Sequence, residues 1–283
     1  CGYKNIGFSY GAPENCGATI VLHGDEEIEK AQLYHAGAEV GQGSHTVFAQ
    51  FTAEALGLPV EKVELRLSDT ATSRNSGSVS ASRMTFMSGN AISGAAQQAL
   101  ERWQAGDRPA VGDFVYRPPA TSPMDKVDGH CYPNFAYGYV AEAVLAEVNT
   151  QTGEVRLKDV ICADDVGKAI NPSLVEGQIE GGVVQAAGYT LMENFITQKG
   201  KTLTKELSTY LIPTSADIPE HVESLILEYP DPIGPHGARG MGEMPYLPFV
   251  PAVIDAVYQA IGIRFNTFPL TAEAVLRGLG KIN

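Results

Sequence analysis

One carboxylate, Glu243, stands in a glycine-rich segment, GARGMGEMPY, residues 237–246. Glycine allows the backbone to approach a ligand closely, at a cost in chain entropy that ordinary loops avoid. The apolar run MPYLPFVPAV begins directly after Glu243, so we expect a carboxylate shielded from water, as suits a general base. The alternative is a solvated loop glutamate, which is the commoner environment for this residue type.

Two other segments have residues suited to binding an anion. EVGQGSHT, residues 39–46, is a Gly-Gln-Gly turn at Gly41, Gln42 and Gly43 that leads into a predicted helix. NSGSVSASR, residues 75–83, offers serine hydroxyls before a second helix. Free amides and the helix dipole favour a phosphate at such positions. Taken alone, such a segment is more often an ordinary turn or cap.

Together with residues 237–242, these loops indicate one large phosphorylated cofactor. The chain lacks the GxxxxGK[ST] lysine of a P-loop and the strand–GxGxxG–helix context of a dinucleotide fold, so neither of those two interpretations holds. The six histidines are not spaced as a metal motif, so we expect no metal ligand among the side chains.

GFSYG, residues 7–11, satisfies the G-x-S-x-G pattern of the α/β-hydrolases. In that fold the serine lies between a buried strand and a helix. Only six residues precede the segment, and Pro13 follows closely, which disfavours this context. A serine hydrolase that uses Ser9 with one of the histidines stays open as an outside alternative.

The composition limits the classes of partner. Lys and Arg number 20 against 33 Asp and Glu, a formal net charge of −13, and no basic block is present. Neither a nucleic acid nor an anionic membrane surface is therefore expected as a partner. The four cysteines form no CxxC pair, which argues against a zinc ribbon, an iron–sulfur cluster on this chain or a disulfide scaffold. We expect a reducing, cytoplasmic setting without a membrane span or signal peptide.

Strands and helices are interspersed without a βαβ rhythm, which predicts an α+β fold. We expect a first subdomain over 1–104, a Pro-rich connection over 105–127 and a second subdomain over 128–283. Asn171 and Pro172 are suited to begin a long helix, and Gly153 is suited to the turn of a hairpin. The expected strands are 17–24, 31–37, 62–68, 136–148 and 154–164, and the expected helices are 44–56 (capped by Ser44), 80–103, 170–194, 248–261 and 271–279.

Four segments together resemble the molybdenum hydroxylase family, which includes xanthine dehydrogenase, aldehyde oxidoreductase, carbon monoxide dehydrogenase and nicotinate dehydrogenase. They are GAEVGQGSHTVFAQFTAEALGLP, SVSASRMTFMSGNA, DVGKAINPSLVEGQIEGGVVQAAGYTLMEN and GARGMGEMP. Their order and spacing resemble the C-terminal half of the molybdopterin-binding large subunit, and the layout is nearest to split-subunit enzymes such as nicotinate dehydrogenase. The resemblance implies two intertwined α+β subdomains of the aldehyde oxidase and xanthine dehydrogenase type.

The resemblance also implies roles for particular residues. Glu243 matches the family's catalytic glutamate, which takes a proton from a molybdenum-bound hydroxyl while an electron-poor carbon is oxidised. Phe8 and Ser9 match positions that face the substrate, and the backbone of Gly77 matches a segment beside the metal. The positions that match cofactor-binding residues are Gly41, Gln42, Gly43, Gly77, Ser78, Val79, Ser80, Gln178, Gly240 and Gly242.

The resemblance further implies what other chains supply. The expected cofactor is molybdenum–molybdopterin in its cytosine dinucleotide form, with [2Fe-2S] clusters and FAD on partner chains. The expected partners are a second molybdopterin-binding chain or the missing N-terminal half, an iron–sulfur subunit and an FAD subunit. We therefore expect this chain to be inactive alone and to expose apolar surface where a partner docks. The substrate is a purine, another N-heterocycle or an aldehyde; the alternative is a non-catalytic chain or an inactive fragment that only holds or assembles cofactor.

Overall fold

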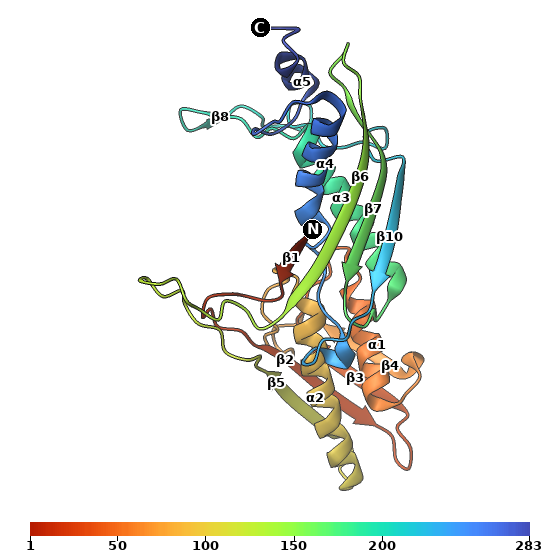
Figure 1. Cartoon of the computed structure of the whole chain (residues 1–283). Coiled ribbons are helices and arrows are strands. Elements are labelled where there is room, and N and C mark those ends of the chain that lie inside the picture. Colours follow the sequence, from red (N-terminus) through yellow and green to blue (C-terminus); the bar gives the residue numbers. More distant parts are fainter.

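The computed structural model describes all 283 residues. They form two four-stranded sheets, each packed against helices, and a short two-stranded ribbon (Figure 1). This mixture confirms the predicted α+β class. None of the helices is both long enough and apolar enough to span a membrane.

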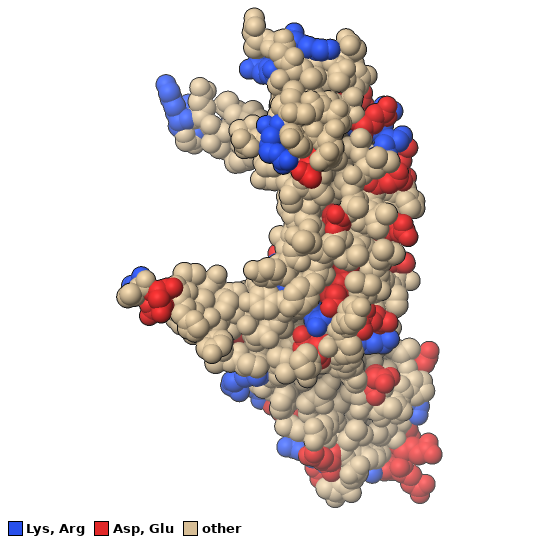
Figure 2. All heavy atoms as spheres, viewed as in Figure 1, with Lys and Arg blue, Asp and Glu red and all other residues tan.

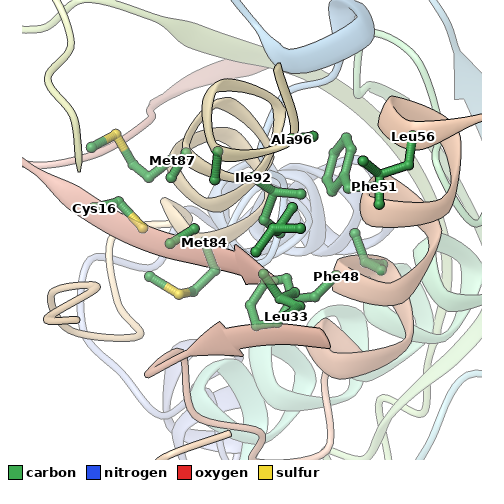
Figure 3. Close-up of a cluster of buried hydrophobic side chains, with 14 of the residues drawn as sticks. Cys16, Leu33, Phe48, Phe51, Leu56, Met84, Met87, Ile92 and Ala96 are labelled. Atoms are coloured by element: carbon green, nitrogen blue, oxygen red, sulfur yellow. The ribbon is translucent and has the colours of Figure 1, made fainter. Parts of the chain in front are cut away.

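The first sheet has the strand order β4-β3-β2-β5. Strand β2 is antiparallel to β3 and β5, whereas β3 is parallel to β4. Helices α1 and α2 pack together against this sheet, and their apolar side chains, among them Phe48, Phe51 and Ile92, form the largest buried cluster (Figure 3). The elements are β2 (Cys16–His23), β3 (Lys30–His35), α1 (Ser44–Leu56), a 3-10 turn η1 (Val60–Lys62), β4 (Val63–Leu67), α2 (Met84–Gln104) and β5 (Ala110–Tyr116).

The second sheet has the order β1-β6-β7-β10. Strand β6 is antiparallel to β1 and β7, and β10 is parallel to β7. Helix α4 lies along β6 and contacts α3, and α3 also contacts β10. The elements are β1 (Gly2–Asn5), β6 (Tyr137–Val148), β7 (Val155–Asp165), α3 (Pro172–Leu191), β8 (Thr197–Gln198), β9 (Lys201–Thr202), β10 (His221–Leu227), a 3-10 turn η2 (Pro235–Gly237), α4 (Tyr246–Ile261) and α5 (Ala272–Gly278).

Several local predictions are confirmed. The Asn171 side chain accepts a hydrogen bond from the Leu174 amide at 3.2 Å, and Pro172 occupies the first turn of α3. Gly153 has φ +80°, the left-handed conformation that the β6–β7 turn needs. The intertwining is visible in β1, because the N-terminal strand pairs with β6 of the second sheet.

Other predictions are wrong in part. Residues 110–116 of the expected Pro-rich connection form β5, an edge strand of the first sheet, and strands β1 and β10 were not predicted. Helix α2 begins at Met84 rather than at Ser80, because Ala81 and Ser82 have left-handed φ values of 53° and 51°. The N-cap of α1 is Gly43, which makes no side-chain cap bond, so the predicted cap by Ser44 is wrong. Helix α3 ends at Leu191, before residue 194.

Two projections extend from the same side of the molecule and leave a concave surface between them (Figures 1 and 2). We call residues 117–134 the first arm and residues 193–212, which include β8 and β9, the second arm. Large apolar side chains are exposed on both, as expected for a docking surface. They are Met124, Val127 and Tyr132 on the first arm and Phe195, Ile196, Leu203, Leu207, Leu211 and Ile212 on the second.

Candidate functional site

A cleft of about 560 Å³ lies where the two sheet-and-helix units meet. Its walls come from the turn before α1, the segment before α2, the start of α3 and the glycine-rich segment before α4. Segments that are far apart in the sequence therefore converge on one space, of the size usual for small-molecule sites. Seven of the candidate site residues line it: Gln42, Val79, Ser80, Gln178, Gly240, Gly242 and Glu243.

The remaining candidates lie beside the cleft rather than in its wall. Gly41 and Gly43 flank Gln42, and Gly77 and Ser78 precede Val79 in the chain. Phe8 and Ser9 belong to the loop after β1. That loop is tied to the cleft wall by a hydrogen bond of 2.9 Å from the Gly7 amide to the Ala81 carbonyl.

Glu243 is anchored through one of its two carboxylate oxygens. The Ser82 hydroxyl donates to Oε2 at 2.9 Å and accepts a hydrogen bond from the Glu243 amide at 3.1 Å. The Lys4 ammonium lies 3.3 Å from the same Oε2. The Glu243 side chain is 54% exposed, so the expectation that this chain alone shields it from water is wrong.

The glycines near Glu243 differ in whether a side chain could be accommodated at their positions. A Cβ on Gly240 would collide with the Ser82 carbonyl, so this glycine lets two loops lie in contact. A Cβ on Gly242 would meet only the Gln178 side-chain oxygen, at 3.7 Å. On α3, Gly177 and Gly181 would meet nothing within 4 Å. Of these open glycines only Gly242 lines the cleft, where it leaves space for a bulky ligand.

The Gly-Gln-Gly turn is already occupied by a carboxylate of the protein itself. Glu39 accepts hydrogen bonds from the amides of Gly41 (2.8 Å), Gly43 (2.9 Å) and His45 (3.1 Å). Partial burial opposes its ionisation, but these donors outweigh that effect and lower the pKa of Glu39. In this arrangement the three amides are paired with Glu39, and the expected phosphate contact with them stays a prediction. Gln42 folds back on the turn, donating to Ser44 Oγ at 2.7 Å and the Ala38 carbonyl at 2.9 Å.

Arg83 holds the segment before α2, and the sequence did not single it out. Its guanidinium pairs with Glu14 at 2.9 Å, and the two side chains are only 1% and 5% exposed. It also donates to the carbonyls of Ser76, Ser78 and Asn15 at 2.8–2.9 Å. The only sequence signal was an arginine that ends a serine-rich segment.

The outside alternative of a serine hydrolase finds no base at Ser9. The Ser9 hydroxyl accepts hydrogen bonds from the side-chain amides of Asn5 (3.1 Å) and Asn134 (3.0 Å), and no histidine contacts it. No helix follows the GFSYG segment either. Ser9 therefore lacks the nucleophile–base pair that this chemistry requires.

Comparison with known proteins points to a single family. The model of the molybdopterin cofactor-binding domain matches residues 1–108 and 105–219. A probable component of xanthine dehydrogenase from Bacillus subtilis is 30% identical, over 97% of this chain and 40% of the relative. Aldehyde oxidoreductase from Megalodesulfovibrio gigas is 29% identical, over 98% of this chain and 32% of the relative.

A solved structure agrees with these relatives. Aldehyde oxidoreductase from Desulfovibrio desulfuricans superposes with a TM-score of 0.88 and 29% identity, over 98% of this chain and 31% of that protein. The chain thus spans 40% or less of the length of these relatives.

Proposed function

The chain belongs to the molybdenum hydroxylase family, and on this premise we propose that it forms part of a molybdopterin site in which Glu243 is the general base. The substrate class is an electron-poor carbon of a purine, another N-heterocycle or an aldehyde. The observation that carries the proposal is the position of Glu243, whose carboxylate lines the cleft between the two units. One of its oxygens, Oε2, is anchored, while Oε1 has no hydrogen-bond partner within the chain.

The residues that line the cleft fit a bulky pterin group. Gln178 presents an amide side chain, which can donate to and accept from a heterocycle, and Val79 and Ser80 also line the cleft. Gln42 would do the same after releasing its bonds to Ala38 and Ser44. Gly242 keeps the backbone before Glu243 bare, and Gly240, which packs on the Ser82 carbonyl, also lines the cleft. Gly41, Gly43, Gly77 and Ser78 would support these contacts from the adjoining loops. Bound there, the molybdenum–pterin group would supply the oxygen and the two-electron acceptor for hydroxylation.

Glu243 would receive a proton at Oε1 while Ser82 and Lys4 hold Oε2. A carboxylate acts as a base when it lies within hydrogen-bond reach of the proton it abstracts. Phe8 and Ser9, in the loop tied to Ala81, would contact substrate at the edge of the site. We favour an aromatic heterocycle or purine, and the relatives named as xanthine dehydrogenase and hypoxanthine oxidase support this choice.

The proposed activity also requires other protein chains. Two relatives are named as parts of larger assemblies, one of a xanthine dehydrogenase and the other as the large chain of a carbon monoxide dehydrogenase. We propose that this chain works in such an assembly, with a second molybdopterin-binding chain or half, an iron–sulfur component carrying [2Fe-2S] clusters and an FAD component. The pterin would carry a cytosine nucleotide, which acid release and chromatography of the nucleotide can identify.

The test is Glu243→Gln in the complex purified after co-expression with its genomic neighbours. The amide keeps the shape of the side chain and cannot act as a base, so turnover should fall by at least about 100-fold, with molybdenum and pterin retained. Glu54→Gln, an exposed position on α1, is the matched control and should leave turnover unchanged. Purine, N-heterocycle and aldehyde substrates are compared in parallel.

Unchanged turnover in Glu243→Gln would remove the general base from the proposal and favour a chain that only holds or assembles cofactor. A complex that contains neither molybdenum nor pterin would favour an inactive fragment. Loss of turnover with all substrates, cofactor being retained, supports the catalytic assignment.

A further inference from the structure

Lys4 lies in β1, at the opposite end of the sequence from Glu243, yet its ammonium lies 3.3 Å from Glu243 Oε2. The Lys4 side chain is only 13% exposed, whereas that of Glu243 is 54% exposed. The pair therefore consists of a nearly buried cation and a carboxylate that reaches into the cleft. An ion pair with one partner fixed by burial loses less side-chain entropy than an exposed pair.

The three donors of the Lys4 ammonium all have partners within the chain. They are the Asn5 carbonyl at 2.7 Å, Asn5 Oδ1 at 3.0 Å and Glu243 Oε2 at 3.3 Å. An ammonium group has no more than three N–H bonds to donate. Lys4 therefore has no donor left for a substrate, and its position suits it to orient Glu243.

Ser82 approaches the same oxygen from the other side, and its backbone is held in an unusual conformation. Ala81 and Ser82 have φ values of 53° and 51°, a left-handed conformation that is strained for non-glycine residues. The Gly7 amide holds the Ala81 carbonyl, and Gly240 packs on the Ser82 carbonyl. Surrounding contacts therefore maintain a strained segment that directs the Ser82 hydroxyl at Glu243.

We propose that Lys4 and Ser82 are positioning residues that clamp Glu243 through Oε2 and leave Oε1 as the oxygen that accepts the proton. The inference rests on the proposed function of Glu243 as the base. With Oε2 held by an ammonium and a hydroxyl, rotation of the carboxylate is restricted and one lone-pair direction faces the reacting atoms. Loss of either donor frees the carboxylate to sample other orientations, and misplacement of a base by about 1 Å is enough to lower the rate about 100-fold.

The test compares Lys4→Met, Ser82→Ala and the double variant in the assembled, cofactor-loaded complex. Each single variant should lower kcat by about 10- to 100-fold with little change in KM, because the clamp acts on the base and not on substrate binding. The double variant should lose little more than the worse single variant, since both residues serve one carboxylate. Lys4→Arg, which keeps a cation at the position, should recover most of kcat.

Lys158→Met is the matched control, because Lys158 pairs with Glu220 away from the cleft. It should leave kcat and KM unchanged. A second readout does not depend on turnover. A crystal structure of the wild type should show Glu243 in one conformer, and a crystal structure of Lys4→Met should show it in several. Molybdenum content is measured for every variant, so that loss of cofactor is not mistaken for loss of orientation.

Wild-type kcat and a single Glu243 conformer in Lys4→Met and Ser82→Ala would overturn the clamp. A fall in kcat that Lys4→Arg does not recover at all would also overturn it, since the cation would then not be what matters. A separate result would contradict the proposed function: undiminished turnover of the Glu243→Gln complex. In that case the number of Glu243 conformers still decides whether the clamp exists.

Discussion

At the scale of single residues, Arg83 joins more of the candidate site than any other side chain. Its guanidinium connects Glu14 and Asn15, in the loop after β1, with Ser76 and Ser78, in the segment before α2. Its carbon Cζ also lies 5.6 Å from the centre of the Phe8 ring. One buried cation therefore fixes the loop that carries Phe8 and Ser9 against the loop that lines the cleft.

Arg83→Met should destabilise the protein by about 3–5 kcal/mol, because the Glu14 carboxylate is left buried without its partner. Urea unfolding followed by circular dichroism measures the change. Arg74→Met is the control: the Arg74 side chain, which pairs with Asp113, is half exposed, and exposed ion pairs contribute little to stability. If Arg83→Met and Arg74→Met lost the same free energy of unfolding, the Arg83 pair would not have the stabilising role proposed for it. Glu14→Gln added to Arg83→Met should recover part of the loss, since it removes the unpaired charge.

The candidate site could be predicted from sequence only where one short segment carried the signal. Glu243, Gln42 and Gln178 lie in recognisable motifs, and all three line the cleft. Lys4 and Arg83 could not be found in this way. Their importance comes from contacts with partners 239 and 69 positions away in the chain, and no local pattern marks such a contact. Glu39 precedes a predicted turn, yet only the structure shows that it takes the turn's amides.

At the scale of elements, the second sheet contains an unusual polar cluster on its helix-facing side. The Cys162 thiol on β7 lies 3.1 Å from Glu142 on β6 and 2.9 Å from Asp164 on β7. One oxygen of each carboxyl group is buried without a hydrogen-bond partner. Burial raises the pKa of Glu142 to about 8 and that of Asp164 to about 6. Cys162 belongs to the same apolar cluster as Met241 and Met244, so this group supports the segment that carries Glu243.

These raised pKa values predict that the free energy of unfolding falls as the pH rises. In the unfolded chain both carboxyl groups lose their protons near their ordinary pKa values of about 4. The folded protein keeps the Asp164 proton to about pH 6 and the Glu142 proton to about pH 8. The two protonated carboxyl groups therefore contribute their full share of the unfolding free energy below about pH 4. Above that pH the share of each group declines by roughly 1 kcal/mol per pH unit until its folded pKa is passed.

Urea unfolding at pH values from 5 to 9 tests this expectation. Glu142→Gln should flatten the dependence between pH 6 and 8, the range in which the folded protein keeps the Glu142 proton after Asp164 has lost its own. Glu54→Gln, at an exposed position on α1, should leave the dependence unchanged. A Glu142→Gln profile identical to that of the wild type would show that Glu142 is ionised in the folded protein.

Most of the helices and the central strands were predictable, because their apolar periodicity and end signals are local. Strand β1 was not, since four residues without clear alternation form a strand only by pairing with β6. Strand β5 follows the cis Arg108–Pro109 bond and lies in a proline-rich stretch that masked it. Helix α2 began late because the packing of two loops imposes left-handed backbone at Ala81 and Ser82, which no propensity scale predicts.

At the scale of the whole molecule, the two arms expose apolar side chains although the chain buries three apolar clusters elsewhere. Figure 2 shows them on either side of a concave surface on which few charged side chains lie. Val127 on the first arm is 96% exposed and Leu207 on the second is 70% exposed. Exposed apolar side chains concentrated in this way mark interaction sites rather than stable surface. We infer that the arms are the surface that the partner chain covers.

Val127→Asp and Leu207→Asp test this inference without disturbing the fold. Both side chains are already in water, so the free energy of unfolding should change by no more than about 0.5 kcal/mol. In the assembled complex an aspartate would lose its hydration without gaining a partner, a cost of at least about 1–2 kcal/mol, which weakens binding about tenfold or more. Co-purification of a tagged partner chain should fall accordingly, while Val60→Asp, an exposed apolar position outside both arms, should have no effect. If both arm variants co-purified with the partner as well as the wild type does, the interface would lie elsewhere, because an aspartate buried in an apolar interface would weaken binding.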